Sequence, residues 1–400
     1  MKRKRIETWI ALIIVGVGLL LAAIPGMWVF MSATAPTLHP NPEDVPSETH
    51  SSPLPEWADA VERGQQIIRA GLTDQNLPGL SVAVGVGNNL VWAEGFGWAD
   101  LENRVPVTPD TPFRIGTASK ALTSAAVGLL LEKGQLKLDD EIQTYVPDFP
   151  KKEWPVTLRQ LMGHLAGVRN DAGDEEDVTS RCDETDEALQ RFAERSLLFE
   201  PGTQYRYSNY GWILVSAAIE AAGEEPYSAV MRQRIFEPLG MRHTSVDGAM
   251  VIPERAVYYF PRFAGDPRYG PQEPTEVDFS CFAGSSGILS TPTDLVRFVM
   301  AINNGKLLQP ATVELLQTSQ RLPSGQETGY GLGWDLETVT LSGAQRSVVG
   351  YDGDLRGGMV ASFLTFREQG IVVAVTANTS YADTASLASS IAQAFADRQR

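Results

Sequence analysis

Thr117 and Lys120 stand three residues apart at the expected start of a helix over 118–133. Side chains at this spacing share a helix face, so the hydroxyl and the amine can meet. A helix N-terminus favours a developing alkoxide and an uncharged lysine, and the backbone N–H of residue 117 can bind an oxyanion. The pair predicts a nucleophile and its base, provided that burial lowers the lysine pKa. The alternative is a capping Thr before an exposed Lys. Ser119 is a poor substitute, because it lies on a different face.

A second pair, Tyr207 and Asn209, is separated by one residue. In an extended segment, residues two apart point the same way, so the phenol and the amide can both face the nucleophile. Taken alone, a tyrosine such as Tyr207 is more often a packing residue whose hydroxyl is satisfied.

Six sequence blocks follow one another in the order found in a known family. They are FRIGTASKALT (113–123), RQLMGHLAGVR (159–169), LLFEPGTQYRYSNYGW (197–212), IFEPLGM (235–241), AGSSGILSTPTDLVRF (283–298) and YGLGW (330–334). From about residue 56 to 400 the chain resembles the serine β-lactamase and penicillin-binding-protein-like superfamily. The resemblance is closest to the branch of class C β-lactamases, esterases and mitochondrial β-lactamase-like proteins.

The resemblance implies roles for the residues singled out above. Thr117 occupies the position of the nucleophilic serine, Tyr207 shuttles protons with Lys120, and Asn209 orients the substrate. The threonine is a departure from the family pattern. Its β-methyl group restricts χ1 and crowds the attacking oxygen, so reduced or absent activity is expected.

The family's third motif corresponds to Tyr351-Asp352-Gly353. The resemblance implies that Tyr351 and Gly353 contribute to substrate binding and that Asp354 supplies the second oxyanion N–H. Asp352 and Asp354 add negative charge where relatives have a cation, so anionic β-lactams should be disfavoured unless Arg356 offsets it. An acidic turn between strands explains these residues equally well.

The surrounding elements predict an α+β fold of the β-lactamase/transpeptidase-like type, with an antiparallel sheet formed by N- and C-terminal strands and a mostly helical region inserted between them. The predicted hairpins are 80–86 with 90–96 and 359–366 with 371–378. The predicted helices are 158–164, with Thr157 as its cap, then 185–194, 212–222, 229–236 and a final helix over 384–397.

The N-terminus divides into three parts before the domain at 56–400. Residues 1–7 are basic and are expected in the cytoplasm, and the apolar segment 8–31 has the length of a transmembrane signal anchor. Residues 32–55 are rich in proline and serine and predict a linker. We therefore expect a single-pass protein of the inner membrane with its C-terminal domain in the periplasm. A signal peptide cleaved after residue 35 is the alternative, and it also exports the domain.

Composition excludes several function classes. The net charge of -16 disfavours a nucleic-acid partner. No phosphate-binding loop or zinc-binding pattern is present, so neither a cofactor nor a metal is expected. The two cysteines, Cys182 and Cys281, allow one disulfide or two thiols.

Three functions compete at this point. The first is a hydrolase that is acylated on Thr117 and acts on a small ester, amide or peptide. The second is a catalytically impaired, membrane-tethered binding or scaffold protein with the same fold. The third, a D-Ala-D-Ala peptidase, suits the compartment, but its substrate carboxylate does not suit the acidic third motif.

Overall fold

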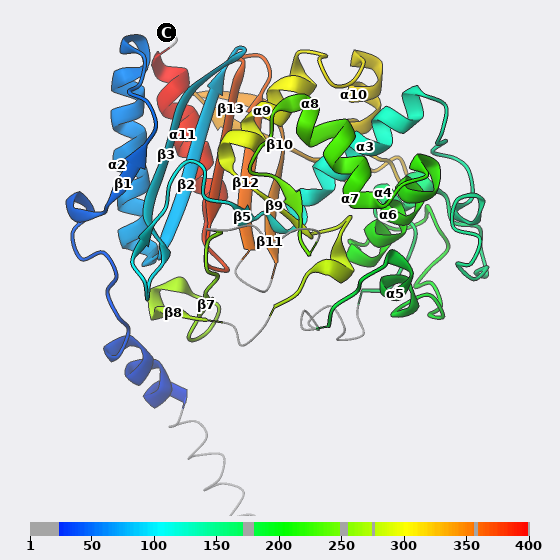
Figure 1. The fold of residues 1–400 in the computed structure, drawn as a ribbon, viewed down its shortest axis with the longest axis horizontal. Helices are drawn as coiled ribbons and strands as arrows, with labels where there is room; N and C mark the ends of the chain where they lie inside the picture. Colours follow the sequence, from blue (N-terminus) through cyan, green and yellow to red (C-terminus); the bar gives the residue numbers. More distant parts are fainter. Residues whose placement is uncertain (1–23, 171–179, 249–254, 274–276, 356–358, 399–400) are drawn as a thin grey trace, which may run out of the picture.

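The computed structural model describes residues 24–398 apart from 171–179, 249–254, 274–276 and 356–358. An eight-stranded antiparallel sheet runs through this part of the chain (Figure 1), in the order β1-β3-β2-β13-β12-β11-β10, with β4 paired to β3. The strands are β1 (Ser47–Thr49), β2 (Gly79–Val86), β3 (Asn89–Asp100), β4 (Val105–Pro106), β10 (Asp335–Leu341), β11 (Ala344–Leu355), β12 (Met359–Phe366) and β13 (Ile371–Ala377). Both predicted hairpins are confirmed, and β2 pairs with β13, so strands from the two ends share one sheet. The α+β prediction is therefore confirmed.

Helices cover both faces of the sheet (Figure 1). On one face, α2 (Ala58–Gln75) and α11 (Thr384–Arg398) form a core with alternate residues of the central strands. On the other face, α9 (Pro292–Asn303) comes close to β2 at Gly85, where a Cβ would meet the side chains of Val296 and Met300. Because both faces are buried, every residue of β13 is buried, and the strand is a nearly continuous apolar run.

The inserted helical region lies beside the sheet, on the right in Figure 1. It contains α3 (Ser119–Glu132), α4 (Leu158–Met162), α5 (Thr185–Gln190), α6 (Asn209–Gly223), α7 (Tyr227–Met231), a π-helical segment (Arg232–Phe236), α8 (Glu237–Leu239) and α10 (Pro310–Leu316). Thr157 caps α4 as predicted, and Gln160 completes a capping box. Two small sheets complete the fold, β5 (Phe113–Arg114) with β9 (Ile288–Ser290) and β6 (Ser245–Val246), and β7 (Phe260–Pro261) with β8 (Pro271–Gln272).

Part of the segment predicted as a linker packs on the domain instead. Residues 47–49 form β1 on the free edge of β3, and Val45 is buried. The prediction of a linker over 32–55 therefore fails for residues 45–49, because a proline-rich composition still leaves the other residues free to pair with a strand edge. Most of the predicted anchor at 8–31 lies outside the described residues. Within them, none of the helices combines the length and the apolar character that crossing a membrane requires.

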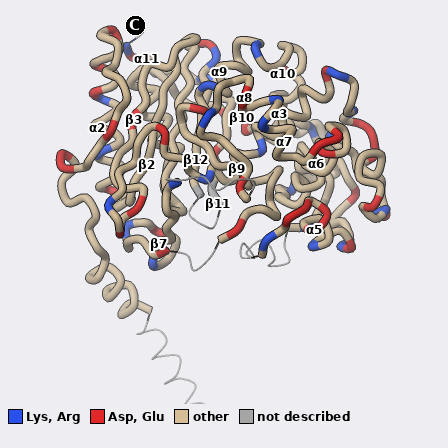
Figure 2. Tube along the Cα trace, viewed as in Figure 1, with Lys and Arg blue, Asp and Glu red and all other residues tan. Residues whose placement is uncertain are grey.

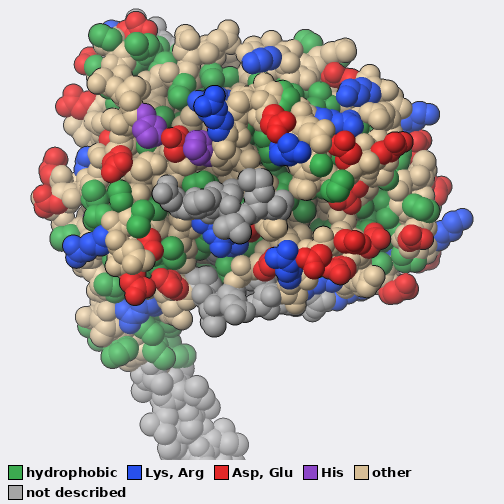
Figure 3. All heavy atoms as spheres, viewed as in Figure 1, with side chains coloured by type: hydrophobic (Ala, Val, Ile, Leu, Met, Phe, Trp, Pro, Cys, Tyr) green, Lys and Arg blue, Asp and Glu red, His purple; other side chains and the backbone are tan. Residues whose placement is uncertain are grey.

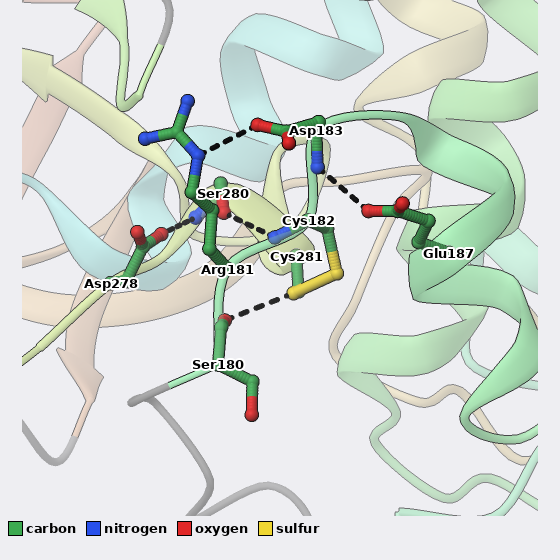
Figure 4. The surroundings of a disulfide bond; sticks show 8 residues. All are labelled: Ser180, Arg181, Cys182, Asp183, Glu187, Asp278, Ser280 and Cys281. Carbon is green, nitrogen blue, oxygen red and sulfur yellow. Dashed lines mark hydrogen bonds and ion pairs between the residues drawn. A yellow bond between two sulfur atoms is a disulfide. The ribbon is translucent and has the colours of Figure 1, made fainter.

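The two cysteines form a disulfide (Figure 4). Cys182 precedes α5, and Cys281 lies in the 3-10 turn Ser280–Phe282, 99 residues further along the chain. The Cys182 N–H also donates to Ser280 Oγ at 2.9 Å. The bridge resolves the question that the sequence left open and ties the start of α5 to the segment that leads into β9.

Candidate active site

A short 3-10 helix, Gly116–Ala118, carries Thr117 between β5 and α3. Gly116 has φ of 53°, which a glycine adopts without strain, and Thr117 is only 4% exposed. The helix predicted over 118–133 is α3, which is confirmed within a residue at each end. Ser119 Oγ donates to Gly116 O at 2.7 Å, so the local backbone occupies this hydroxyl, as its position on another face led us to expect.

Lys120 lies in the first turn of α3 and is fully buried. Its Nζ lies 2.8 Å from the Tyr207 hydroxyl, 2.7 Å from Asn209 Oδ1 and 3.2 Å from the Ser285 carbonyl oxygen. Asn209 Oδ1 and the carbonyl can only accept hydrogen bonds. An uncharged amine that gives its two hydrogens to them would therefore turn its lone pair toward Tyr207. The structure thus brings together Lys120, Tyr207 and Asn209, and the reading of Lys120 as an exposed residue was wrong.

Tyr207 connects the lysine to Thr117. The Thr117 side chain lies near enough to the Tyr207 hydroxyl to act on the pKa of that phenol. Burial raises the pKa of Tyr207 far above its usual range, although the Tyr351 and Thr117 hydroxyls oppose this rise, so the phenol is neutral at pH 7. Tyr207 lies just before α6 and Asn209 is the first residue of that helix, whose N-terminus is capped by Ser208 Oγ. Both side chains reach Lys120 even though Asn209 is helical rather than extended.

The third motif lies on β11, next to the turn that carries Thr117. A Cβ at Gly353 would lie 2.7 Å from the backbone nitrogen of Ala118, so only glycine lets the strand come this close. Tyr351 is 2% exposed, and its hydroxyl lies 3.0 Å from that of Tyr207. Tyr351 therefore contacts Tyr207 from within the protein interior. Asp354 follows on β11 and pairs with Val360 in the ladder.

The negative charge of Asp352 points away from Thr117. Its carboxylate accepts a hydrogen bond from Ser362 Oγ at 2.6 Å, and Ser362 Oγ contacts Thr384 Oγ1 at the start of α11. The negative charge that Asp352 was expected to add at the third motif therefore lies on the other side of the sheet from Thr117, because residues alternate along a strand and Tyr351 occupies the reactive face. Arg356 and the side chain of Asp354 lie outside the described residues.

Sequence reasoning did not select Asp335, the first residue of β10. Its carboxylate accepts a hydrogen bond from the Asp352 N–H at 3.2 Å. Burial raises the pKa of Asp335 to about 7, while the charge of Lys120 and the backbone hydrogen bond oppose the rise. The charge of Asp335 also helps burial to raise the pKa of Tyr205 to about 12. The one sequence signal is an acidic residue directly after the YGLGW block.

His164 is a structural neighbour of the reactive centre. Its Nδ1 accepts the Ser208 N–H at 3.1 Å, and its ring lies 4.2 Å from the ring of Tyr207. Burial lowers the pKa of His164 far below its usual range, and the nearby Lys120 acts in the same direction, so the ring is neutral. These contacts are those of a hydrogen-bonded structural histidine.

A separate cavity of about 1340 Å³ lies away from these residues and includes none of them in its lining. Two histidines from distant parts of the sequence meet Asp110 there, His50 at 2.9 Å and His243 at 3.6 Å. No sequence pattern indicated this pairing. Across the described residues, no group of three or more His, Cys, Asp or Glu side chains is arranged to hold a metal ion.

Acidic residues are frequent around the helical region. Figure 2 shows them along α5 and the neighbouring segments, and Figure 3 shows them gathered on the right-hand part of this face. A cavity of about 750 Å³ beside the disulfide is also lined by acidic residues, among them Asp183, Asp186, Glu220 and Glu224. The field around this side of the molecule therefore repels anions.

Comparisons with known proteins agree with this geometry. The sequence profile of the Beta-lactamase family matches residues 65–396. The serine beta-lactamase-like protein LACTB, mitochondrial, from Homo sapiens is 30% identical over 323 residues, which cover 62% of this chain and 57% of the relative. Penicillin-binding protein 4* from Bacillus subtilis is 27% identical over 277 residues, 66% of this chain and 60% of the relative. The match thus spans less than two thirds of the length of these relatives.

Solved structures share the fold. The D-amino acid amidase from Ochrobactrum anthropi SV3, crystallised with L-phenylalanine amide, superposes with a TM-score of 0.74 at 25% identity, covering 86% of this chain and all of the amidase (100%). The octameric penicillin-binding protein homologue from Pyrococcus abyssi gives a TM-score of 0.71 at 25% identity, covering 84% of this chain and 77% of the homologue. These likenesses confirm the resemblance inferred from the six sequence blocks.

Proposed function

This chain belongs to the beta-lactamase family, and on that basis we propose that it is a hydrolase that forms an acyl-enzyme on Thr117. The observation that carries the proposal is the linked set of Thr117, Tyr207 and Lys120. Thr117 lies near the phenol and acts on its pKa, and the phenol lies 2.8 Å from the buried amine. A hydroxyl, a base and a group that orients the base are the parts that covalent catalysis requires.

The acylation step follows from these contacts. Tyr207 passes its proton to the Lys120 amine, and its oxygen then takes the proton of Thr117 as Oγ bonds to the substrate carbonyl carbon. The tetrahedral intermediate collapses when the bond to the leaving group breaks, and the leaving oxygen or nitrogen receives the proton held by the Tyr207–Lys120 pair. Water then attacks the acyl-threonine through the same pair, which releases the acid and restores the hydroxyl.

The threonine sets the expected rate. Its methyl group restricts χ1, and Thr117 is 4% exposed, so the oxygen has little freedom to approach a carbonyl. We expect slower acylation than a serine at this position would give.

The substrate is proposed to be a small ester, amide or peptide without a carboxylate next to the reacting bond. Asp335 adds negative charge near the Lys120–Tyr207 pair whenever it is ionised, and acidic side chains also gather on the right-hand part of the face in Figure 3. The terminal carboxylate of a D-Ala-D-Ala peptide is disfavoured by this field.

We also propose that the apolar segment 8–31 anchors the protein in the inner membrane with the domain in the periplasm. The basic residues before the segment support this orientation, and the Cys182–Cys281 disulfide suits an oxidising compartment. Sequencing the N-terminus of the mature protein from a membrane fraction tests it. A mature chain that starts at Pro36 would replace the anchor by a cleaved signal peptide.

A catalytically impaired scaffold is the second candidate, and two observations favour it. Thr117 replaces the nucleophilic serine, and Tyr351 in the third motif, where relatives have a cation, is only 2% exposed. Turnover that disappears in Lys120→Ala would eliminate this candidate.

Intact-mass measurement after treatment with a fluorophosphonate and with p-nitrophenyl esters tests the hydrolase proposal. We expect a covalent adduct that maps to Thr117 in the wild type, no adduct in Thr117→Ala, and faster labelling in Thr117→Ser, because removal of the methyl group relieves crowding. Equal labelling of wild type and Thr117→Ala would end the proposal. Slower labelling of Thr117→Ser would count against the nucleophile assignment.

A further inference from the structure

Three tyrosine hydroxyls form a line that leads from Lys120 into the protein interior. Lys120 Nζ lies 2.8 Å from the Tyr207 hydroxyl, which lies 3.0 Å from that of Tyr351. The Tyr351 hydroxyl in turn lies 3.1 Å from that of Tyr330. The three residues come from separate segments, before α6, on β11 and before β10, so the fold assembles the line.

The protons on this line have a defined direction. Burial raises the pKa values of Tyr330 and Tyr351 well above their usual range, so both phenols are neutral and each has one hydrogen to donate. Among the described residues, the Tyr330 hydroxyl has Tyr351 as its only hydrogen-bond partner, and Tyr330 is 2% exposed. A buried O–H that does not donate costs the full desolvation of that group. The Tyr330 hydroxyl therefore donates to Tyr351.

The remaining directions follow along the line. Because the Tyr351 oxygen accepts from Tyr330, its own hydrogen is free to point at the Tyr207 oxygen. Tyr207 then accepts from Tyr351, and its single hydrogen is left for the side of Lys120 and Thr117. This is the orientation that the proposed acylation needs, since Tyr207 must give its proton to Lys120 and hold negative charge on its oxygen.

We propose that Tyr330 is a positioning residue that orients the Tyr351 hydroxyl as a donor to the Tyr207 oxygen and so prepares Tyr207 to act as the base toward Thr117. Tyr330 touches neither the substrate nor Thr117 and acts only through Tyr351. The inference rests on the proposed acylation of Thr117. It gives a role to Tyr330, the first residue of the YGLGW block, to which the sequence motifs assigned none.

A double-mutant cycle tests the proposal, with acylation rates measured by stopped-flow release of p-nitrophenol. We expect Tyr330→Phe to slow acylation about tenfold and Tyr351→Phe to slow it at least as much, because a misdirected proton must reorient before transfer. The double variant should be no slower than Tyr351→Phe alone, since Tyr330 has no other route to Tyr207. Losses that multiply would overturn the proposal.

The pH profile gives a readout that a merely structural role would not move. Loss of the donor to Tyr207 destabilises its ionised form, so the rising limb of the acylation rate should move to higher pH in Tyr330→Phe. The other titrating groups beside the line are unchanged in this variant, namely Lys120, Asp335, His164 and Tyr205. An unshifted limb would contradict the proposal.

Tyr227→Phe is the matched control. Tyr227 is also buried, and its hydroxyl lies 2.7 Å from Thr123 Oγ1, one turn along α3 from Lys120, outside the line. It should lose a comparable hydrogen bond and keep the wild-type rate and pH profile. A Tyr330→Phe protein that behaves like Tyr227→Phe would overturn the proposal.

Two further measurements keep the outcomes separate. If Tyr330→Phe does not fold, 3,5-difluorotyrosine at position 330 keeps the ring and makes the hydroxyl a stronger donor, so the rising limb should move to lower pH; no movement would count against Tyr330. If the wild type itself forms no adduct on Thr117, the proposed function fails. A wild type that is acylated normally alongside an unaffected Tyr330 variant removes only the inference.

Discussion

The two faces of the central sheet are built from side chains of different size and polarity. Toward α2 and α11, alternate residues of the two central C-terminal strands are mostly large and apolar, namely Val360, Leu364, Phe366, Ile371, Val373 and Val375. Toward the reactive centre, the intervening residues include Ala361, Phe363, Val372 and Ala374, and Gly353 lies on the neighbouring strand. One sheet thus presents a bulky face and a face on which small residues let other elements come close.

This difference separates stability from reactivity. On the bulky face, Phe395 of α11 stacks between Trp57 and Trp92, with ring centroids 5.7 and 6.2 Å away. On the other face, β11 approaches the turn at Thr117 closely enough that Gly353 has no room for a side chain. On the bulky face, large apolar contacts are expected to supply free energy of folding. On the reactive face, close backbone contacts are expected to fix the geometry of the polar groups.

The largest expected effect is on the reactive face. Lys120→Met keeps the length of the side chain and removes the amine, so acylation should fall by about a thousandfold or more. Stability should fall by only about 1–3 kcal/mol, because Asn209 Oδ1 and the Ser285 carbonyl lose a donor. Ester-release rates and urea unfolding measure the two quantities. Lys133→Met, an exposed change at the far end of α3, is the control. Acylation that survives in Lys120→Met would remove the amine from the mechanism.

The opposite pattern is expected on the bulky face. Phe395→Ala should cost about 3–5 kcal/mol of unfolding free energy, because it removes a fully buried ring from an aromatic stack. The acylation rate of the folded protein should stay at the wild-type value at temperatures below its lowered melting point. Thermal unfolding followed by circular dichroism gives the first quantity. Slower acylation in a sample that is fully folded would show that the two faces are coupled.

The sequence predicted the elements whose signals are local. The two hairpins and α3 carry alternating or helical patterns with turn residues at their ends, and the Thr157 cap is a four-residue motif. Lys120, Tyr207 and Asn209 were predicted to meet because the order of the sequence blocks indicated a known arrangement. For each of them, the structure supplies the contact.

The features that the sequence did not reveal depend on contacts between distant segments. The Tyr330 hydroxyl gains its role only when β11 brings Tyr351 beside it, and nothing within the YGLGW block indicates that contact. Similarly, β1 forms because the edge of β3 is free to pair with it. The proline-rich composition of residues 32–55 does not indicate a strand there. The face of the sheet on which Asp352 lies could have been predicted from alternation along the strand, because Asp352 directly follows Tyr351, which was assigned to the reactive face.

The smallest expected effect concerns the pH dependence of stability through Asp335. Its folded-state pKa of about 7 is above the ordinary value of 3.8 because the carboxyl is buried, so the folded protein keeps a proton that the unfolded chain loses. Its contribution to stability is therefore present below pH 4 and is lost as the pH rises toward 7. Each pKa unit corresponds to about 1.4 kcal/mol, and because the carboxyl keeps some contact with solvent we expect about 2 kcal/mol of lost stability.

Asp335→Asn removes the titrating group and keeps an acceptor for the Asp352 N–H. Stability measured by urea unfolding at pH 5 and at pH 8 should therefore fall less between these values in Asp335→Asn than in the wild type. Glu314→Gln, an exposed change on α10, should retain the wild-type difference. If Asp335→Asn also retains it, the carboxyl is ionised in the folded protein at neutral pH. Its negative charge would then act on the Lys120–Tyr207 pair throughout the neutral pH range. The two faces of the central sheet would in that case differ in charge as well as in packing.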